Sequence, residues 1–228
     1  MRMNRDCGQV SFHPDLSMLN DYAAGALTGA FALPVSVHLE YCSKCRTQVR
    51  SLERVGAAMF EALEPSSVSD DALEKLFSRI DASLVAPARS DQVSAVDFPV
   101  PSALRDLIPS KGFEAMKWRK VSKGLRASVL QYGDTGREVA LHHIKAGARV
   151  TQHNHRGNEV TVVLMGSFSD KDGVYREGDF VMRGPGDVHC PTASQYDDCL
   201  CLSVLDAPVQ LPGLIGMLAR PLVRLRPQ

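Results

Sequence analysis

The sequence predicts two domains of different class, an all-α domain followed by an all-β domain. Up to about residue 84 the apolar residues recur at helical spacing, whereas from about Gly124 they alternate with a period of two. A small, polar, proline-containing stretch separates the two patterns. We therefore expect a helical domain over residues 1–85, a linker over 86–97 and a β domain over 98–228.

Charge and composition exclude several classes of protein. The 26 acidic and 26 basic side chains cancel, so the chain has no general attraction for nucleic acid or an anionic membrane. No apolar stretch is long and uninterrupted enough to cross a bilayer, and the first twenty residues lack the apolar core of a signal peptide. Six cysteines without a secretory signal favour a reducing compartment. We expect a cytoplasmic protein.

The first two helices follow from apolar spacing between residues 16 and 41. Apolar residues from Leu16 to Leu27 form one helical face, with Pro14 in the expected first turn and Gly29 after the expected end. A second helix is expected from about Ala30 to Tyr41.

Two further helices are expected before the linker. The third starts near Cys42, has an apolar face that reaches Leu63, and is broken at Pro65. Ser69 is the expected cap of a fourth helix. That helix has a strongly apolar stripe after a break, which indicates either core or a partner-binding face made of Leu73, Leu76, Phe77 and Ile80.

A metal motif, H-x3-C-x2-C, occupies residues 38–45. Thiolate and imidazole are the ligands that zinc prefers, and a structural site needs four of them in a tetrahedron. On one straight helix His38 and Cys45 would lie about 10 Å apart. We therefore expect His38 near the end of one helix, and Cys42 with Cys45 at a turn that opens the next. The alternative is that both cysteines only fill a helical core.

The fourth ligand of this site must come from upstream. His13, at the start of the first helix, is our choice. Cys7 is the competitor and Asp15 a weaker third candidate. A zinc ion would compensate for the small core of short helices, because metal binding free energy is also folding free energy.

These features resemble a known domain. The histidine at 13, the run Tyr22–Gly25 and the H-x3-C-x2-C motif are similar to the zinc-binding anti-sigma domain of the ChrR family, over most of residues 11–63. The resemblance implies that the helices sequester an extracytoplasmic-function (ECF) sigma factor and block its access to RNA polymerase. It also implies structural zinc on His13, His38, Cys42 and Cys45.

Short strands with glycine, aspartate and proline turns predict a sandwich or barrel for the second domain. Residues 98–101 are expected to be extended and to open it. The strand candidates are Ala127–Tyr132, Glu138–Ile144, Glu159–Met165, Phe180–Met182 and Cys199–Leu205.

One segment of this half resembles the cupins, which are jelly-roll barrels. Gly147-x5-His153-x-His155-x3-Glu159-x6-Gly166 matches the first cupin motif at every spacing. The two histidines, two positions apart, point to one side of a strand. The flanking glycines let the backbone bend at the corners of a barrel.

The second cupin motif is fainter. Gly178 and the stretch Pro185–His189 supply a turn and a third histidine, His189. Gly184 stands where the family has proline, and Ala193 where it has asparagine. These departures weaken the match of the loop but leave the ligand in place.

Together the two motifs predict a site of three histidines and one carboxylate, which are His153, His155, Glu159 and His189. This ligand set admits zinc, iron(II), manganese or nickel, and zinc is the metal we expect. An unidentified small ligand could bind in the barrel.

Other candidate residues lie near this site in sequence. Cys199 and Cys201 face the same side of a strand and form either a redox pair or two small core residues. Cys190 adjoins a predicted ligand. His142 and His143 lack any motif, so we assign them to ordinary strand positions.

The leading functional hypothesis is a cytoplasmic zinc anti-sigma factor with a C-terminal cupin sensor. The family resemblance implies a response to oxidative stress such as singlet oxygen or organic peroxides. The alternative is a metal-dependent cupin enzyme, a dioxygenase or isomerase. A zinc-based DNA-binding module is disfavoured, because Arg46 and Arg50 are too few to track phosphates.

Overall fold

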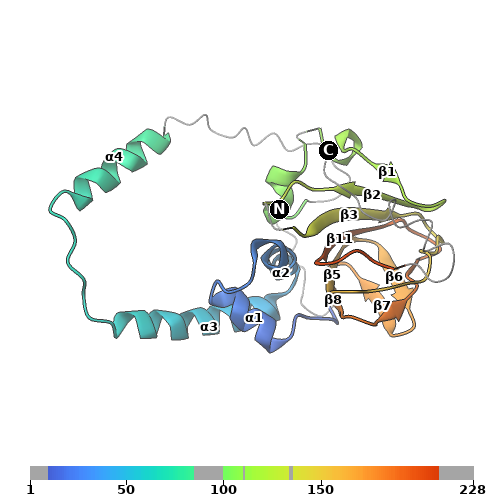
Figure 1. Cartoon of the computed structure of the whole chain (residues 1–228), viewed down its shortest axis with the longest axis horizontal. Coiled ribbons are helices and arrows are strands. Elements are labelled where there is room, and N and C mark those ends of the chain that lie inside the picture. The colour runs from blue at the N-terminus through green and yellow to red at the C-terminus, as the bar shows by residue number, and fades with distance from the viewer. Residues whose placement is uncertain (1–9, 85–99, 110, 134–135, 211–228) are drawn as a thin grey trace.

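The structure is a computed structural model that describes residues 10–84, 100–109, 111–133 and 136–210. The expected linker over 86–97 and the candidate ligand Cys7 lie outside these residues. Within them a helical region precedes a β-rich region (Figure 1), as the sequence predicts. No helix in the described ranges has the length and apolarity needed to cross a membrane.

The β-rich region is built on one six-stranded antiparallel sheet with the order β1-β2-β3-β11-β5-β8. Its strands are β1 (Arg119–Lys120), β2 (Leu125–Val129), β3 (Glu138–Ile144), β5 (Glu159–Met165), β8 (Phe180–Arg183) and β11 (Cys199–Leu205). A three-stranded sheet contains β10 (Thr192–Ala193), β6 (Ser167–Asp170) and β7 (Gly173–Arg176). A two-stranded sheet pairs β4 (His153–Asn154) with β9 (Val188–His189).

Most strand predictions are confirmed, three of them to the residue. The exception is β2, which lies at Leu125–Val129 rather than 127–132, because its pairing with β3 begins at Leu125 opposite Ile144. Two short 3-10 helices, η1 (Ser102–Leu107) and η2 (Phe113–Ala115), precede the sheet and were not predicted.

The helices are α1 (Leu16–Ala23), α2 (Gly29–Tyr41), α3 (Ser43–Glu61) and α4 (Ala72–Leu84). Three predicted boundaries are wrong. Pro14 precedes α1, because the Asp15 side chain caps its first turn. Gly25, with φ +68°, follows the end of α1, and Gly29 instead begins α2. Ser69 lies outside α4, which begins at Ala72.

The helices and the sheet share one apolar core. Helix α2 lies against the sheet beside β5, β8 and β11, and α1 and α3 pack on it from the other side (Figure 1). Leu33 and Val35 of α2 belong to the same buried cluster as Val160 of β5 and Leu202 of β11. The opposite face of the sheet packs on β6 and β7 through a second cluster that includes Phe168. The two regions of different periodicity are therefore joined by buried apolar contacts.

The last turns of α3 and the whole of α4 extend away from this core (Figure 1). On α3, Val49 is buried, whereas Val55 is 59% and Phe60 75% exposed. On α4, Leu76 is 51% and Phe77 56% exposed. These helices keep apolar side chains in solvent that a packed domain would bury.

Candidate metal centres

Two groups of four metal-ligating side chains come together in the structure, and both are the groups chosen from the sequence. In each group the ligand atoms lie within 4.8 Å of one another. Asp15 belongs to neither, because its carboxylate caps α1. The first group is His13, His38, Cys42 and Cys45, and the second is His153, His155, Glu159 and His189.

The N-terminal cluster forms where the chain breaks between α2 and α3. His38 lies in the last turn of α2, and Cys42 is the extended N-cap residue of α3, so Cys45 falls in the next helix. This is the arrangement that the spacing predicts. The Sγ atoms of Cys42 and Cys45 each lie 3.5 Å from Nδ1 of His13, which approaches from the segment before α1.

The orientation and the protonation state of the His38 imidazole suit it to bind a cation. Its Nδ1 lies 2.7 Å from the backbone oxygen of Gly178 and donates to it. Its Nε2 is buried and finds no hydrogen-bond partner among the residues that the structure describes. Burial lowers the pKa of His38 to about 4, so the ring is neutral and this nitrogen has a free lone pair. A metal ion would satisfy an atom that is otherwise costly to bury.

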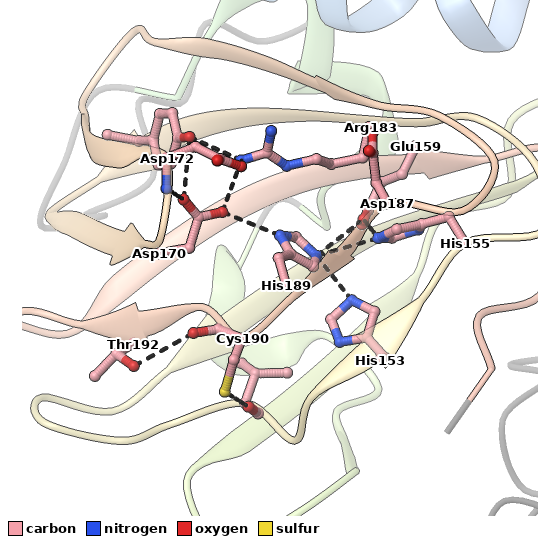
Figure 2. Close-up of polar contacts among 12 residues, drawn as sticks. His153, His155, Glu159, Asp170, Asp172, Arg183, Asp187, His189, Cys190 and Thr192 are labelled. Carbon is pink, nitrogen blue, oxygen red and sulfur yellow. Dashed lines mark hydrogen bonds and ion pairs between the residues drawn. The ribbon is translucent and has the colours of Figure 1, made fainter. Parts of the chain in front are cut away.

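The second cluster is set by the register of the small sheet. His153 of β4 pairs directly with His189 of β9, and Glu159 begins β5 (Figure 2). Nε2 of His189 lies 2.9 Å from Nε2 of His153 and 3.1 Å from Nε2 of His155. The Glu159 carboxylate is 3.4 Å from Nε2 of His155. All four ligand atoms thus face one point.

Hydrogen bonds behind this cluster fix the orientation of two imidazoles. Nδ1 of His153 lies 2.9 Å from the Thr151 carbonyl, and Nδ1 of His189 lies 3.2 Å from Oδ2 of Asp170. Both rings donate from Nδ1, so their Nε2 lone pairs point at each other. Burial, with the neighbouring His153, lowers the pKa of His189 to about 4. Lone pairs in this arrangement repel unless a cation lies between them, so the residues fit a metal ion.

The carboxylate of this cluster is ionised although it is buried. Burial raises the pKa of Glu159, but the His155 imidazole and the Ser203 hydroxyl outweigh it and hold the pKa below its ordinary value. The Ser203 hydroxyl donates to Oε1 at 2.6 Å, which leaves Oε2 facing the histidines. An anionic oxygen beside three imidazoles favours a divalent cation.

Comparison with known proteins agrees with this geometry. A family model described as the ChrR cupin-like domain matches residues 111–208. Anti-sigma-E factor ChrR of Cereibacter sphaeroides is 32% identical over 217 residues, which cover 95% of this chain and 99% of ChrR. The chain belongs to the ChrR family. The name of this relative is that of an anti-sigma factor.

A solved structure of the ChrR family has the same fold. The crystal structure of Rhodobacter sphaeroides SigE in complex with the anti-sigma ChrR superposes with a TM-score of 0.74 at 31% identity, covering 87% of this chain and 100% of the matched chain. The predicted order of a helical region followed by a cupin-like region is therefore confirmed for this member of the family.

The sequence interpretation missed the charged residues that support the cupin-like cluster of this ChrR-family chain. The side chain of Asp170 is fully buried and accepts from Nη2 of Arg183 at 2.7 Å (Figure 2). Arg183 also donates to the Tyr175 hydroxyl at 2.8 Å and pairs with Asp172 at 3.0 Å. Asp170, Asp172 and Tyr175 lie between the two motifs, and Arg183 is at a variable position of the second, so no local spacing could have indicated them.

The remaining candidates occupy the strand positions that the sequence predicts. The Sγ atoms of Cys199 and Cys201 are buried on β11, 3.6 Å apart. The neighbouring thiol and burial raise the pKa of Cys201 well above its ordinary value, so it is a neutral thiol. His142 and His143 lie on β3, where His143 pairs with Asp198 at 3.0 Å. The redox role of the two thiols stays a prediction.

Proposed function

We propose that this chain is an anti-sigma factor of the cytoplasm that sequesters an ECF sigma factor. The observation on which the proposal rests is the likeness to ChrR over nearly the whole chain, together with a crystal structure of ChrR bound to SigE. In this proposal the helical region binds the sigma factor, and the cupin-like region determines when it is released.

Zinc is the metal proposed for the N-terminal cluster. Its two cysteines and two histidines are a closed set of four ligands of the kind found in structural zinc sites. Zinc bound there would tie the segment before α1 to α2 and to α3. We propose zinc for the cupin-like cluster as well, whose ligands also suit iron(II), manganese and nickel.

The sigma-binding surface is proposed to lie on α4 and to continue onto α3. Exposed apolar groups on a monomer mark sites of interaction, because their burial against a partner is favourable. The α4 residues, 44–64% exposed, are Leu73, Leu76, Phe77 and Ile80. The α3 end and the turn after it add Val55, Met59, Phe60 and Leu63, which are 59–75% exposed.

Release is proposed to begin at the cupin-like cluster, in response to an oxidant such as singlet oxygen or an organic peroxide. An oxidant lowers sigma affinity only if it changes a group that differs between the bound and free conformations. The groups proposed to react with the oxidant are the metal ligands of the cupin-like cluster, which include His189, and the thiols of Cys199 and Cys201.

The test replaces Leu76, at the middle of the α4 stripe, by glutamate. An unpaired charge in an apolar interface should cost at least about 2 kcal/mol, which is roughly a 30-fold loss of affinity. Val121→Glu is the matched control, since Val121 is 52% exposed on the cupin-like half. Tagged full-length chain is co-expressed with the ECF sigma factors of its host, and the bound factor is identified by mass spectrometry.

Sigma recovery and inhibition of transcription decide the proposal. Wild type and Val121→Glu should retain an ECF sigma factor and inhibit transcription by RNA polymerase reconstituted with it. Leu76→Glu should lose both properties while its metal content stays unchanged. Equal sigma recovery from Leu76→Glu contradicts the α4 surface, and failure of the wild type to inhibit contradicts the function.

A further inference from the structure

The turn between β7 and β8 belongs to the cupin-like region but contacts the N-terminal cluster. The carbonyl oxygen of Gly178, in this turn, accepts the hydrogen bond from Nδ1 of His38 at 2.7 Å. The next residue, Asp179, accepts at Oδ1 from the backbone N–H groups of Ser11 at 2.6 Å and Phe12 at 3.0 Å. Those two residues directly precede His13. The turn therefore holds the supports of both histidines of the cluster.

Asp179 is built into the turn rather than placed on its surface. The residue is 1% exposed, and its other oxygen accepts from the backbone N–H of Arg176 at 2.8 Å. The backbone N–H of Phe180 donates to the Phe12 carbonyl at 3.0 Å, so the segment before His13 is bound to the turn in both directions. The Phe12 ring also packs on Tyr175 of β7, with centroids 4.6 Å apart.

Helix α2 lies directly against the backbone of this turn. Gly178 has φ +87°, and a Cβ there would lie 2.7 Å from Cβ of Tyr41 on α2 and 2.9 Å from Cγ2 of Val10. Only a residue without a side chain lets the carbonyl reach His38 while α2 stays packed. The close approach of helix and turn is thus a condition for the hydrogen bond to the imidazole.

We propose that the cupin-like region completes the N-terminal metal centre, with Asp179 and the Gly178 carbonyl as positioning groups for His13 and His38. The two thiolates need no such help, because both lie at the start of α3, where the backbone N–H of Cys45 contacts Sγ of Cys42 at 3.4 Å. Helix α3 therefore positions the two cysteine ligands, and the cupin-like region positions the two histidine ligands.

The inference rests on the proposed zinc site but not on sigma binding. Groups that orient a metal-bound histidine from behind commonly change metal affinity by about 10- to 100-fold when they are removed. Zinc binding and the packing of the helical region on the cupin-like region are linked. If this packing raises the affinity for zinc, bound zinc favours the packing by the same factor. A change in the cupin-like region that moves the turn between β7 and β8 would then alter zinc binding at the N-terminal cluster, and so affect the helical region.

The experiment measures zinc affinity at this cluster alone, in the full-length chain. Cobalt(II) is the probe, because absorption from thiolate-bound cobalt reports only the cluster that contains cysteines, and added zinc then displaces the cobalt. Asp179→Ala should weaken zinc binding there by about tenfold or more. Asp198→Ala is the control: its carboxylate also accepts from a backbone N–H, that of Ala146 at 2.8 Å, but among the described residues before His13, which are 10–12, none donates to it.

A second variant and a second measurement protect the test against a folding defect. Phe12→Ala removes the packing of the ring, including its contact with Tyr175, but keeps the backbone hydrogen bonds of the segment, and should weaken zinc binding by a few-fold. Hydrogen exchange of the Ser11, Phe12 and Phe180 amides should slow when zinc is added to the wild type, and should not respond in Asp179→Ala. Unchanged zinc affinity in both variants overturns the inference. No thiolate–cobalt absorption in the wild type overturns the proposed zinc site as well.

Discussion

The two candidate metal clusters contain four ligands each, yet they are assembled in different ways. The cupin-like cluster takes its ligands from β4, β5 and β9 and from His155, which directly follows β4, and its supports from the same region, through Thr151, Asp170 and Ser203. The N-terminal cluster joins three segments and receives its support for His38 from a turn 140 residues away. Strand register fixes the geometry of the cupin-like cluster, whereas the geometry of the N-terminal cluster depends on the packing of the helical region against the turn between β7 and β8. The clusters should therefore respond differently to the loss of a ligand.

The largest expected difference follows from removing one ligand from each cluster. Cys42→Ser should remove one of about two metal ions per chain and unfold the N-terminal helices, since structural zinc contributes on the order of 10 kcal/mol in small domains. His153→Ala should remove the other ion and leave the helices intact. Elemental analysis and thermal unfolding measure both effects. A single ion per chain, insensitive to Cys42→Ser, would contradict the N-terminal assignment.

Acid should destabilise the metal-free protein through both clusters. The pKa values of His38 and His189 are lowered to about 4 by burial, from 6.5. Below pH 6.5 the unfolded chain binds protons that the folded chain does not, so stability is fully present above 6.5 and is lost as the pH falls towards 4. Each histidine contributes up to about 1.4 kcal/mol per pH unit in this window. Urea unfolding at several pH values measures the slope, and a flat profile would show that neither imidazole is buried.

A smaller effect is expected from the supports of the cupin-like cluster. Asp170→Asn replaces the acceptor of the His189 hydrogen bond with an amide and should weaken metal binding there by about tenfold. Asp172→Asn is the control, because Asp172 contacts Arg183 at 3.0 Å but not His189. Competition with a chelator measures the affinity. The thiolate–cobalt absorption of the N-terminal cluster should be the same in both variants, and a change in it would mean that the two clusters are coupled.

The parts that sequence predicted are those encoded by short spacings. The ligands His38, Cys42 and Cys45 lie within one break between helices, and His153, His155 and Glu159 within one motif, so their proximity needs little knowledge of the fold. The bends at Gly147 and Gly166 were also predictable. Both residues have positive φ, and a Cβ on Gly166 would lie 2.2 Å from the Asp198 carbonyl oxygen.

The parts that sequence did not predict depend on contacts between distant segments. Nothing near His38 indicates that Gly178 lies behind its ring, and nothing near His13 indicates Asp179. The shared core was missed for a related reason: the apolar residues of α2 suit a helical bundle as well as the face of a sheet. Local periodicity identifies a buried face but not what covers it.

The uncovered end of α3 and the uncovered helix α4 have a consequence for the amount of this protein in a cell. A copy without its partner exposes apolar side chains such as Phe60 and Phe77 on helices that extend from the core. Proteases and chaperones act on such segments, and a bound partner would shield them. We therefore expect unpartnered copies to be degraded faster than complexed ones. The cellular level of the chain would then follow that of its proposed partner, so that surplus copies do not accumulate.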